Sequence, residues 1–319
     1  MPSRTEGGLQ PARQPSQQNT AREAHKDKIF NVLWEMKKNG KAKATIDTVR
    51  KGLRFLTKHA DLDKPETVKG FIAQLDRKDG YKKQLCFIYD NYVKVYNLQW
   101  TRPSYFVAQK LPKIPTEDNL NMLIANASKK LALAISISKD TGLRPIEVMN
   151  LTLKDVDIEK RYIYPATAKH GSPRRLKLKQ STMDLLKAYL SKHDIRLNEQ
   201  VFGIWTSTRY GDYFRDNRNR LAKKLSNPTL KGIRLYDLRH RYATVLYART
   251  RDILLVKQQM GHRKIETTLM YTQLIDVDDG DAFTCRTASD DKEAKQLIEN
   301  GFEYVATTPQ DFMLFKKRK

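Results

Sequence analysis

The sequence contains few cysteines and no cluster of them. Of 319 residues only two are cysteines, Cys86 and Cys285, and they lie far apart along the chain. Two isolated thiols fit neither a disulfide framework nor a metal site built on paired cysteines. Cys86 falls within a helical pattern, so we expect it to be a small core residue. We therefore expect no disulfide and no bound metal.

Long apolar runs are also lacking. The N-terminus has no apolar segment of the kind that a secretion signal requires. We see no stretch long enough to cross a bilayer and no lipidation signal, so a membrane partner is not expected. The sequence favours a cytosolic protein.

Acidic residues are few compared with basic ones. The chain has 60 lysines and arginines against 36 acidic residues, a formal net charge of +24. Such an excess favours a polyanionic partner, and nucleic acid is the first candidate. A basic surface that serves only solubility is the alternative.

The length predicts two domains, each with a sizeable core. Gln, Ser, Pro, Arg and Gly dominate the first residues, which predicts a disordered basic arm. The stiff stretch from Lys110 to Pro115 is the best domain boundary. The expected segments are an arm over 1–22, a helical domain over 23–109, a linker over 110–116, a larger domain over 117–275 and an extension over 276–319.

The region before the linker shows four helical patterns with period-3.6 apolar residues. Gly40 should end the first, Thr45 should cap the second, and Pro65 should open the third. The fourth should run from about Tyr81 to Leu98. Basic residues fill the other faces, and a solvated face is their default interpretation.

The region after the linker begins with helical signals. Thr116 should cap a helix, and the apolar run Leu131–Ser138 should be buried. Arg144 then precedes Pro145 at a helix start, where unpaired backbone N–H groups favour a phosphate. The alternative is a helix-capping arginine that pairs with Glu147.

Residues 154–179 change period and predict short strands, with a turn at Lys169–Ser172. The expected strands lie around Val156 and Ile158, at Tyr162–Tyr164 and at Arg174–Leu178. A helix should follow around Leu185–Tyr189, and then a basic helix over Tyr210–Leu225.

The stretch from Leu235 to Leu274 predicts three helices joined by short turns. The first should cover 236–250, Asp252 should cap the second, and Gly261 should end it before a third over 265–271. These turns would bring Arg239, His262 and Tyr271 to one place. Arginines bind the oxygens of a phosphodiester, and a tyrosine hydroxyl can attack its phosphorus.

Three motifs in this order resemble the conserved boxes of the tyrosine recombinases, the phage-type integrases. Thr141–Val148, with Arg144, resembles their first arginine box, and Tyr236–His240, with Arg239, resembles their second. Gly261-His262, Thr267-Thr268 and Tyr271 resemble their final box, which carries the nucleophile. Each motif alone is weak, but all three in order are specific.

The resemblance implies a mainly α fold with a small β-sheet, an N-terminal four-helix DNA-clamping domain, a catalytic domain and a small C-terminal αβ extension. It implies that Tyr271 attacks a DNA phosphate to form a 3′-phosphotyrosine. Arg144 and Arg239 would stabilise the phosphorane, His262 would bind a non-bridging oxygen, and Lys169 would protonate the leaving 5′ oxygen. Glu147 and His240 would support these groups structurally.

The resemblance also implies partners. Double-stranded recombination sites would be held by a homotetramer, formed from monomers and exchanging strands through a Holliday junction, with no cofactor and with a possible DNA-bending accessory factor. A C-terminal segment resembling archaeal and plasmid integrases favours integration or excision of a mobile element. The residues expected on DNA are Arg50, Lys51, Arg54, Lys82, Lys83, Arg174 and Arg175.

One position departs from the family pattern. Tyr236 stands where the family usually has a histidine, three residues before Arg239. A phenol is a poor base at neutral pH. The proton of Tyr271 could instead be taken by His262, or two arginines could lower the pKa of the phenol. A DNA-binding protein that no longer cuts, Xer-like dimer resolution and a type IB topoisomerase remain alternatives.

Overall fold

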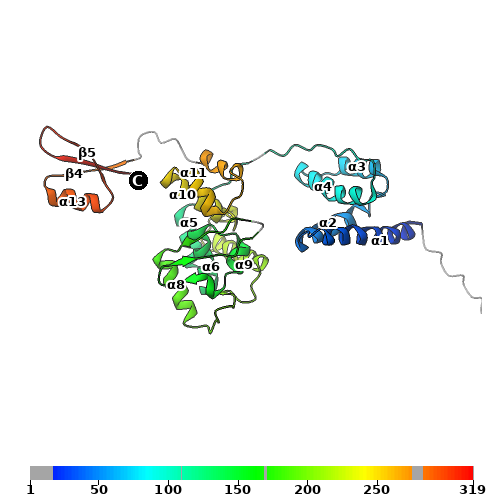
Figure 1. Cartoon of the computed structure of the whole chain (residues 1–319), viewed down its shortest axis with the longest axis horizontal. Coiled ribbons are helices and arrows are strands. Elements are labelled where there is room, and N and C mark those ends of the chain that lie inside the picture. The colour runs from blue at the N-terminus through cyan, green and yellow to red at the C-terminus, as the bar shows by residue number, and fades with distance from the viewer. Residues whose placement is uncertain (1–16, 109, 169–170, 275–282, 319) are drawn as a thin grey trace, which may run out of the picture. The chain divides into compact units, whose positions relative to one another are not determined.

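The computed structural model describes residues 17–108, 110–168, 171–274 and 283–318. Helices dominate, and two small three-stranded sheets accompany them (Figure 1), which confirms the expected mainly α class. The chain divides into two compact units, Met1–Lys110 and Leu111–Lys319. Among the described helices, none combines the length and the apolar character that a bilayer crossing needs.

The first unit is a four-helix domain. Its helices are α1 (Gln17–Lys38), α2 (Lys43–Leu56), α3 (Pro65–Gln74) and α4 (Asp79–Tyr96). One apolar core joins them, with Val32, Leu53 and Tyr89 fully buried. Cys86 is buried in this core, as expected.

Two expectations for this unit were wrong. Helix α1 already begins at Gln17, so residues 17–22 are helical and not part of a disordered arm, while residues 1–16 lie outside the described residues. Helix α2 begins before Thr45, with Ala42 at the N-cap and no side-chain cap. Lys43 and Ala44 are good helix formers, which extends the helix past the expected capping residue.

The second unit is built around α6 (Lys129–Thr141), which packs against α5 (Glu117–Ala125), α8 (Gln180–Leu190) and α10 (Asp237–Thr250). Every residue from Leu131 to Ser138 is buried, as the apolar run predicted. The remaining helical elements are α7 (Pro145–Met149), η1 (Leu153–Asp155), α9 (Ser207–Lys224), η2 (Pro228–Gly232), α11 (Ile253–Met260), α12 (Glu266–Leu269) and η3 (Met270–Leu274).

A short antiparallel sheet accompanies these helices. Strands β1 (Val156–Asp157), β2 (Tyr162–Ile163) and β3 (Leu176–Lys177) lie in that order, and Ile163 pairs with both Val156 and Leu176. Each strand is shorter than expected. Alternation nevertheless extends beyond β3, because Arg174, Leu176 and Leu178 are buried while the residues between them are exposed.

The C-terminal residues form a small αβ module. Strands β4 (Phe283–Ala288), β5 (Glu303–Thr307) and β6 (Met313–Arg318) form a sheet in the order β4-β6-β5, and α13 (Asp291–Glu299) shares a core with it at Ala288, Ala294 and Phe315. The N-cap of α13 is Asp290. Asp290 accepts from the backbone of Glu293, whereas Ser289 binds the Glu293 carboxylate.

Candidate active site

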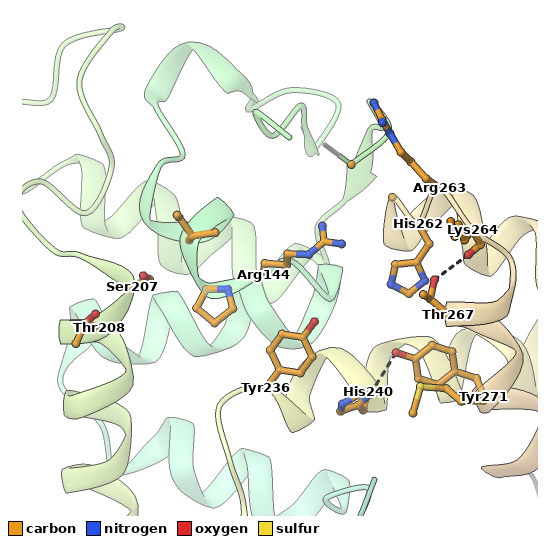
Figure 2. A pocket seen from close by; sticks show the side chains of 15 residues that line it. Arg144, Ser207, Thr208, Tyr236, His240, His262, Arg263, Lys264, Thr267 and Tyr271 are labelled. Atoms are coloured by element: carbon orange, nitrogen blue, oxygen red, sulfur yellow. Dashed lines mark hydrogen bonds between the residues drawn. The ribbon is translucent and has the colours of Figure 1, made fainter. Parts of the chain in front are cut away.

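Separate stretches of the second unit line one cleft of about 740 Å³. Its side chains come from the starts of α7, α9 and α10, from the turn that joins α11 to α12, and from η3 (Figure 2). The cleft brings together Arg144, Tyr236, His240, His262 and Tyr271. Sequence reasoning had placed all five in or beside one site.

A tight turn positions Arg144. Gly142 ends α6 with φ +61, and a Cβ there would lie 2.5 Å from the ring of Tyr242. Glycine therefore meets both a backbone and a packing requirement. Arg144 is then the N-cap of α7, with Pro145 in the first turn.

A buried carboxylate holds two arginines. Glu147 accepts from the backbone N–H of Arg144 at 2.9 Å, from Arg144 Nη1 at 3.0 Å and from Arg174 Nη2 at 2.8 Å. It also accepts from Ala168 N, one residue before Lys169. Although burial alone would raise the pKa of Glu147, Arg174 and Arg144 keep it below its ordinary value. Glu147 therefore links the turn of Arg144 to the hairpin.

Arg174 was expected to contact DNA, but its side chain is buried in the second unit. Its side chain is buried against Glu147, while its Nε and Nη1 have no partner among the described residues. The alternation along its strand turns it inward. Gly261, with φ +62, leaves room for it, because a Cβ there would lie 2.6 Å from Arg174 Nη1.

Arg239 is 2% exposed and uses its guanidinium to join two helix ends. Nη1 donates to Gly142 O and Nη2 to Met260 O, both at 2.6 Å, at the C-termini of α6 and α11. A cation is favoured at such ends. Burial and nearby Arg144 lower the pKa of Arg239 to about 10, so it keeps its charge at neutral pH.

Both ring nitrogens of His262 are engaged. Arg239 Nη2 lies 3.0 Å from Nε2, and Thr268 Oγ1 lies 3.0 Å from Nδ1. Arginine only donates, so Nε2 is the acceptor and Nδ1–H donates to Thr268. Burial, with Arg239 and Arg144, lowers the pKa of His262 to about 4, so the ring is neutral at pH 7.

Tyr271 lines the same cleft as Arg144 and His262, and the residue is 2% exposed. It packs with Ala243, Val256 and Met260. Its hydroxyl lies 3.2 Å from His240 Nδ1, and a dashed line marks this contact in Figure 2. Burial raises the pKa of Tyr271 to about 12, even though Arg239 and Arg144 act to lower it. The hypothesis that the arginines alone make the phenol acidic is therefore not supported.

Tyr236, in contrast, is 45% exposed. It lines the cleft and stands edge-on to His240, with ring centroids 5.2 Å apart. Lys169 lies outside the described residues. Two residues further along the chain, Gly171 lines the cleft, and Ser172 N donates to Gly261 O, so the described end of the hairpin borders the site.

The other expected DNA contacts lie elsewhere. On α2, Lys51 and Arg54 are exposed and Arg50 pairs with Asp47. On α4, Lys83 is exposed while Lys82 donates to Ala73 O. Arg175 is exposed and stacks over Tyr162.

Sequence reasoning missed several cleft residues. Arg263 and Lys264 follow His262 and add two exposed cations. Ser207 and Thr208 bring the N-terminus of α9 to the cleft, and Thr206 caps this helix. The charges after His262 were readable from the sequence, but nothing in it indicated the approach of α9.

Within the described residues, His25, Asp61 and Asp63 of the first unit lie close enough together for a metal ion. His25 Nε2 and both carboxylates already have partners, whereas His25 Nδ1 is buried without one in the described part of the chain. His25 Nε2 pairs with Asp61 at 3.3 Å, and Asp63 pairs with Lys28 at 2.6 Å and accepts from Tyr92 at 2.8 Å. We interpret the group as an ion-pair network.

The sequence is similar to a known protein family and to known proteins. The phage integrase family profile matches residues 113–276. The tyrosine recombinase XerA of Saccharolobus solfataricus is 26% identical over 254 residues, which cover 74% of this chain and 83% of that protein. XerA of Pyrococcus furiosus is 27% identical over 205 residues, 61% of this chain and 65% of that protein.

Solved structures share the fold. A lambda integrase dimer bound to a core site matches with a TM-score of 0.60 at 14% identity, covering 80% of this chain and 95% of that one. The Tn1549 transposon integrase in complex with transposon right-end DNA matches with a TM-score of 0.59 at 16% identity, covering 86% and 99%. Since the family profile spans more than half of the sequence, the chain belongs to the phage integrase family, the tyrosine recombinases.

Proposed function

We propose that this site-specific recombinase cuts and rejoins double-stranded DNA with Tyr271 as its nucleophile, through a 3′-phosphotyrosine. The observation that carries the proposal is the shared cleft, which is lined by Arg144, His262 and Tyr271, with Arg239 hydrogen-bonded to His262. An in-line displacement at a phosphodiester needs these parts, a nucleophile and cations for the developing charge.

Each side chain has a role in this scheme. Arg144 and Arg239 bind the non-bridging oxygens, and Glu147 fixes the direction of Arg144. His262 orients Arg239 and binds the phosphate once DNA displaces its present contact. Lys169 supplies the proton of the leaving 5′ oxygen. The covalent intermediate retains the bond energy, so rejoining needs no nucleotide.

The assembly is part of the proposal. Four protomers would bind two duplex sites and exchange strands in pairs, with the first unit gripping DNA through α2 and α4. An accessory protein that bends DNA would assist, and integration or excision of a mobile element would be the biological role. The similarity to integrases and recombinases supports this scheme over a protein that only binds DNA.

The test is a covalent adduct. DNA fragments selected for binding to the full chain would carry a nick next to each candidate cleavage point, so that a short 5′ fragment diffuses away after cleavage. In EDTA, the wild-type protein and a Tyr213→Phe control should form a protein–DNA adduct on a denaturing gel, while Tyr271→Phe should not. No adduct on DNA that the protein binds would favour the alternative of a non-cutting protein, and an adduct with Tyr271→Phe would mean another nucleophile.

A further inference from the structure

The proton of Tyr271 needs an acceptor. Burial raises the pKa of this phenol to about 12, so the attacking oxygen carries its proton at neutral pH. Attack on phosphorus must therefore be accompanied by proton transfer to a nearby group. The usual family position for a histidine in this cleft holds Tyr236, a phenol, which is a poor base.

His262 is not placed to accept this proton. Its Nε2 lone pair already accepts from Arg239, and its Nδ1–H donates to Thr268. Neither ring nitrogen offers a lone pair to the hydroxyl of Tyr271 in this arrangement.

His240 is placed for it. Its Nδ1 lies 3.2 Å from Tyr271 Oη (Figure 2). Among the described residues, His240 is the hydrogen-bond partner of the Tyr271 hydroxyl. The two residues come from α10 and η3, which pack against each other. Arg239 and His240 are consecutive on α10 and so point in directions about 100° apart. Arg239 donates to the backbone of Gly142 and Met260, whereas His240 contacts Tyr271 on η3.

We propose that His240 accepts the proton of Tyr271 during DNA cleavage, an inference that rests on the proposed function. As Oη forms its bond to phosphorus, the O–H bond breaks and the proton moves to Nδ1, while the bond from phosphorus to the 5′ oxygen breaks. The leaving oxygen takes its proton from a separate donor. In the rejoining step, the imidazolium returns its proton to the phenol that is released.

The surroundings of His240 suit an acceptor. Tyr236, Asp237 and Arg239 surround it at the start of α10, and Arg234 precedes the helix. Tyr271 and His262 approach it from the segments after α11. Burial, with Arg234 and Arg239, lowers the pKa of His240 despite Asp237. The ring is therefore neutral at pH 7, and in the tautomer that carries its proton on Nε2 the phenol O–H donates to the Nδ1 lone pair. Asp237, which is buried and bound to Arg234, would favour the imidazolium once it forms.

The test measures single-turnover adduct formation by the full chain between about pH 5 and 9. His240→Asn places an amide near the position of Nδ1, so it keeps a hydrogen bond to Tyr271 but cannot take a proton. His240→Gln is the second variant in case the first does not fold. DNA affinity and the thermal unfolding midpoint report on folding in each case.

Two substrates separate the acceptor from the donor of protons. One is ordinary nicked DNA, and the other carries sulfur in place of the bridging 5′ oxygen, so that its leaving group needs no proton. Lys169→Ala should be slow on the first substrate and restored on the second. His240→Asn should be roughly a hundredfold slower or more on both, with a rate that still rises at the highest pH.

Three outcomes would overturn the inference. His240→Asn could keep the wild-type rate, it could be restored by the sulfur substrate, or it could be slow with an unchanged pH profile, which would make His240 a positioning residue only. Tyr213→Phe, on α9 outside the lining of the cleft, is the control and should keep the wild-type rate and pH profile. Failure of the wild-type protein to form any Tyr271 adduct would instead contradict the proposed function.

Discussion

Gly261 combines two demands at a single residue. Its φ of +62 is a conformation that side chains disfavour, and a Cβ would meet the guanidinium of Arg174 at 2.6 Å. Gly203 is a matched control, because its φ is +55 but nothing lies within 4 Å of the position that a Cβ would take there. Comparing alanine substitutions at the two glycines therefore separates the cost of backbone strain from the cost of displacing a buried arginine.

We predict that Gly203→Ala lowers the free energy of unfolding by about 1 kcal/mol and leaves cleavage unchanged. Gly261→Ala should cost more, because Arg174 must move and its ion pair with Glu147 is disturbed. It should also slow adduct formation, since Glu147 orients Arg144. Denaturant titration and adduct rates would check both, and equal effects of the two substitutions would contradict the role given to Arg174.

His262 makes stability depend on pH. Its pKa falls to about 4 in the folded chain, mainly through burial, from an ordinary value of about 6.5. Between these values the folded state binds fewer protons than the unfolded state, so stability is fully present above about pH 6.5 and falls as the pH falls toward 4. The shift corresponds to roughly 3 kcal/mol, reduced by solvent screening because the ring is partly exposed.

We therefore predict that His262→Gln shows a shallower loss of stability on acidification than the wild-type chain. Denaturant unfolding of the second unit, measured at several values between about pH 4.5 and 7.5, would test this. Parallel pH dependences of the two proteins would show that His262 is not the titrating group.

At the scale of elements, turn chemistry made much of the site predictable. Gly142 and Gly261 end helices in the left-handed conformation, and Asp252 accepts from Leu254 N and Leu255 N at the start of α11. Such residues fix where a helix stops, and so where Arg144 and His262 stand. The expected third helix is less regular, because it changes from α12 to the 3₁₀ turn η3 before Tyr271.

What local patterns could not show is the inward or outward direction of a polar side chain. Arg174 and Arg175 are adjacent and chemically alike, yet one is buried against Glu147 and the other is exposed. The partner of Arg174 lies 27 residues away. The same holds for His240, whose contact with Tyr271 spans 31 residues and depends on how α10 packs against η3.

Helix α2 offers an element-scale prediction about DNA. Arg54 is exposed on it, whereas Leu53 and Leu56 are buried. If α2 follows the phosphate backbone, Arg54→Ala should weaken binding about equally for all sequences and reduce the slope of log affinity against log salt by about 1. Lys187→Ala, on α8 of the second unit, is the control and should leave the slope unchanged. An unchanged slope for Arg54→Ala would remove α2 from the DNA-binding surface.

At the scale of the whole molecule, each unit has an apolar core of its own. Leu53 and Leu56 belong to the core of the first unit, and Leu133 and Ile135 to that of the second. Residues Lys110 to Pro115 join the two, and we place the domain boundary there. Domains that are joined by a short extended linker, with separate cores, should unfold as separate cooperative units.

The two separate cores predict how the stability of each unit responds when a buried side chain is truncated. Leu53→Ala should lower the stability of the first unit by about 2–5 kcal/mol, because it removes buried methyl groups that the core cannot replace. Calorimetry should then show one transition at a lower temperature, with the transition of the second unit unmoved. Ile135→Ala is the reciprocal variant and should shift only the second unit. If either substitution moved both transitions together, the two units would stabilise each other, and the boundary at 110–116 would not separate independent domains.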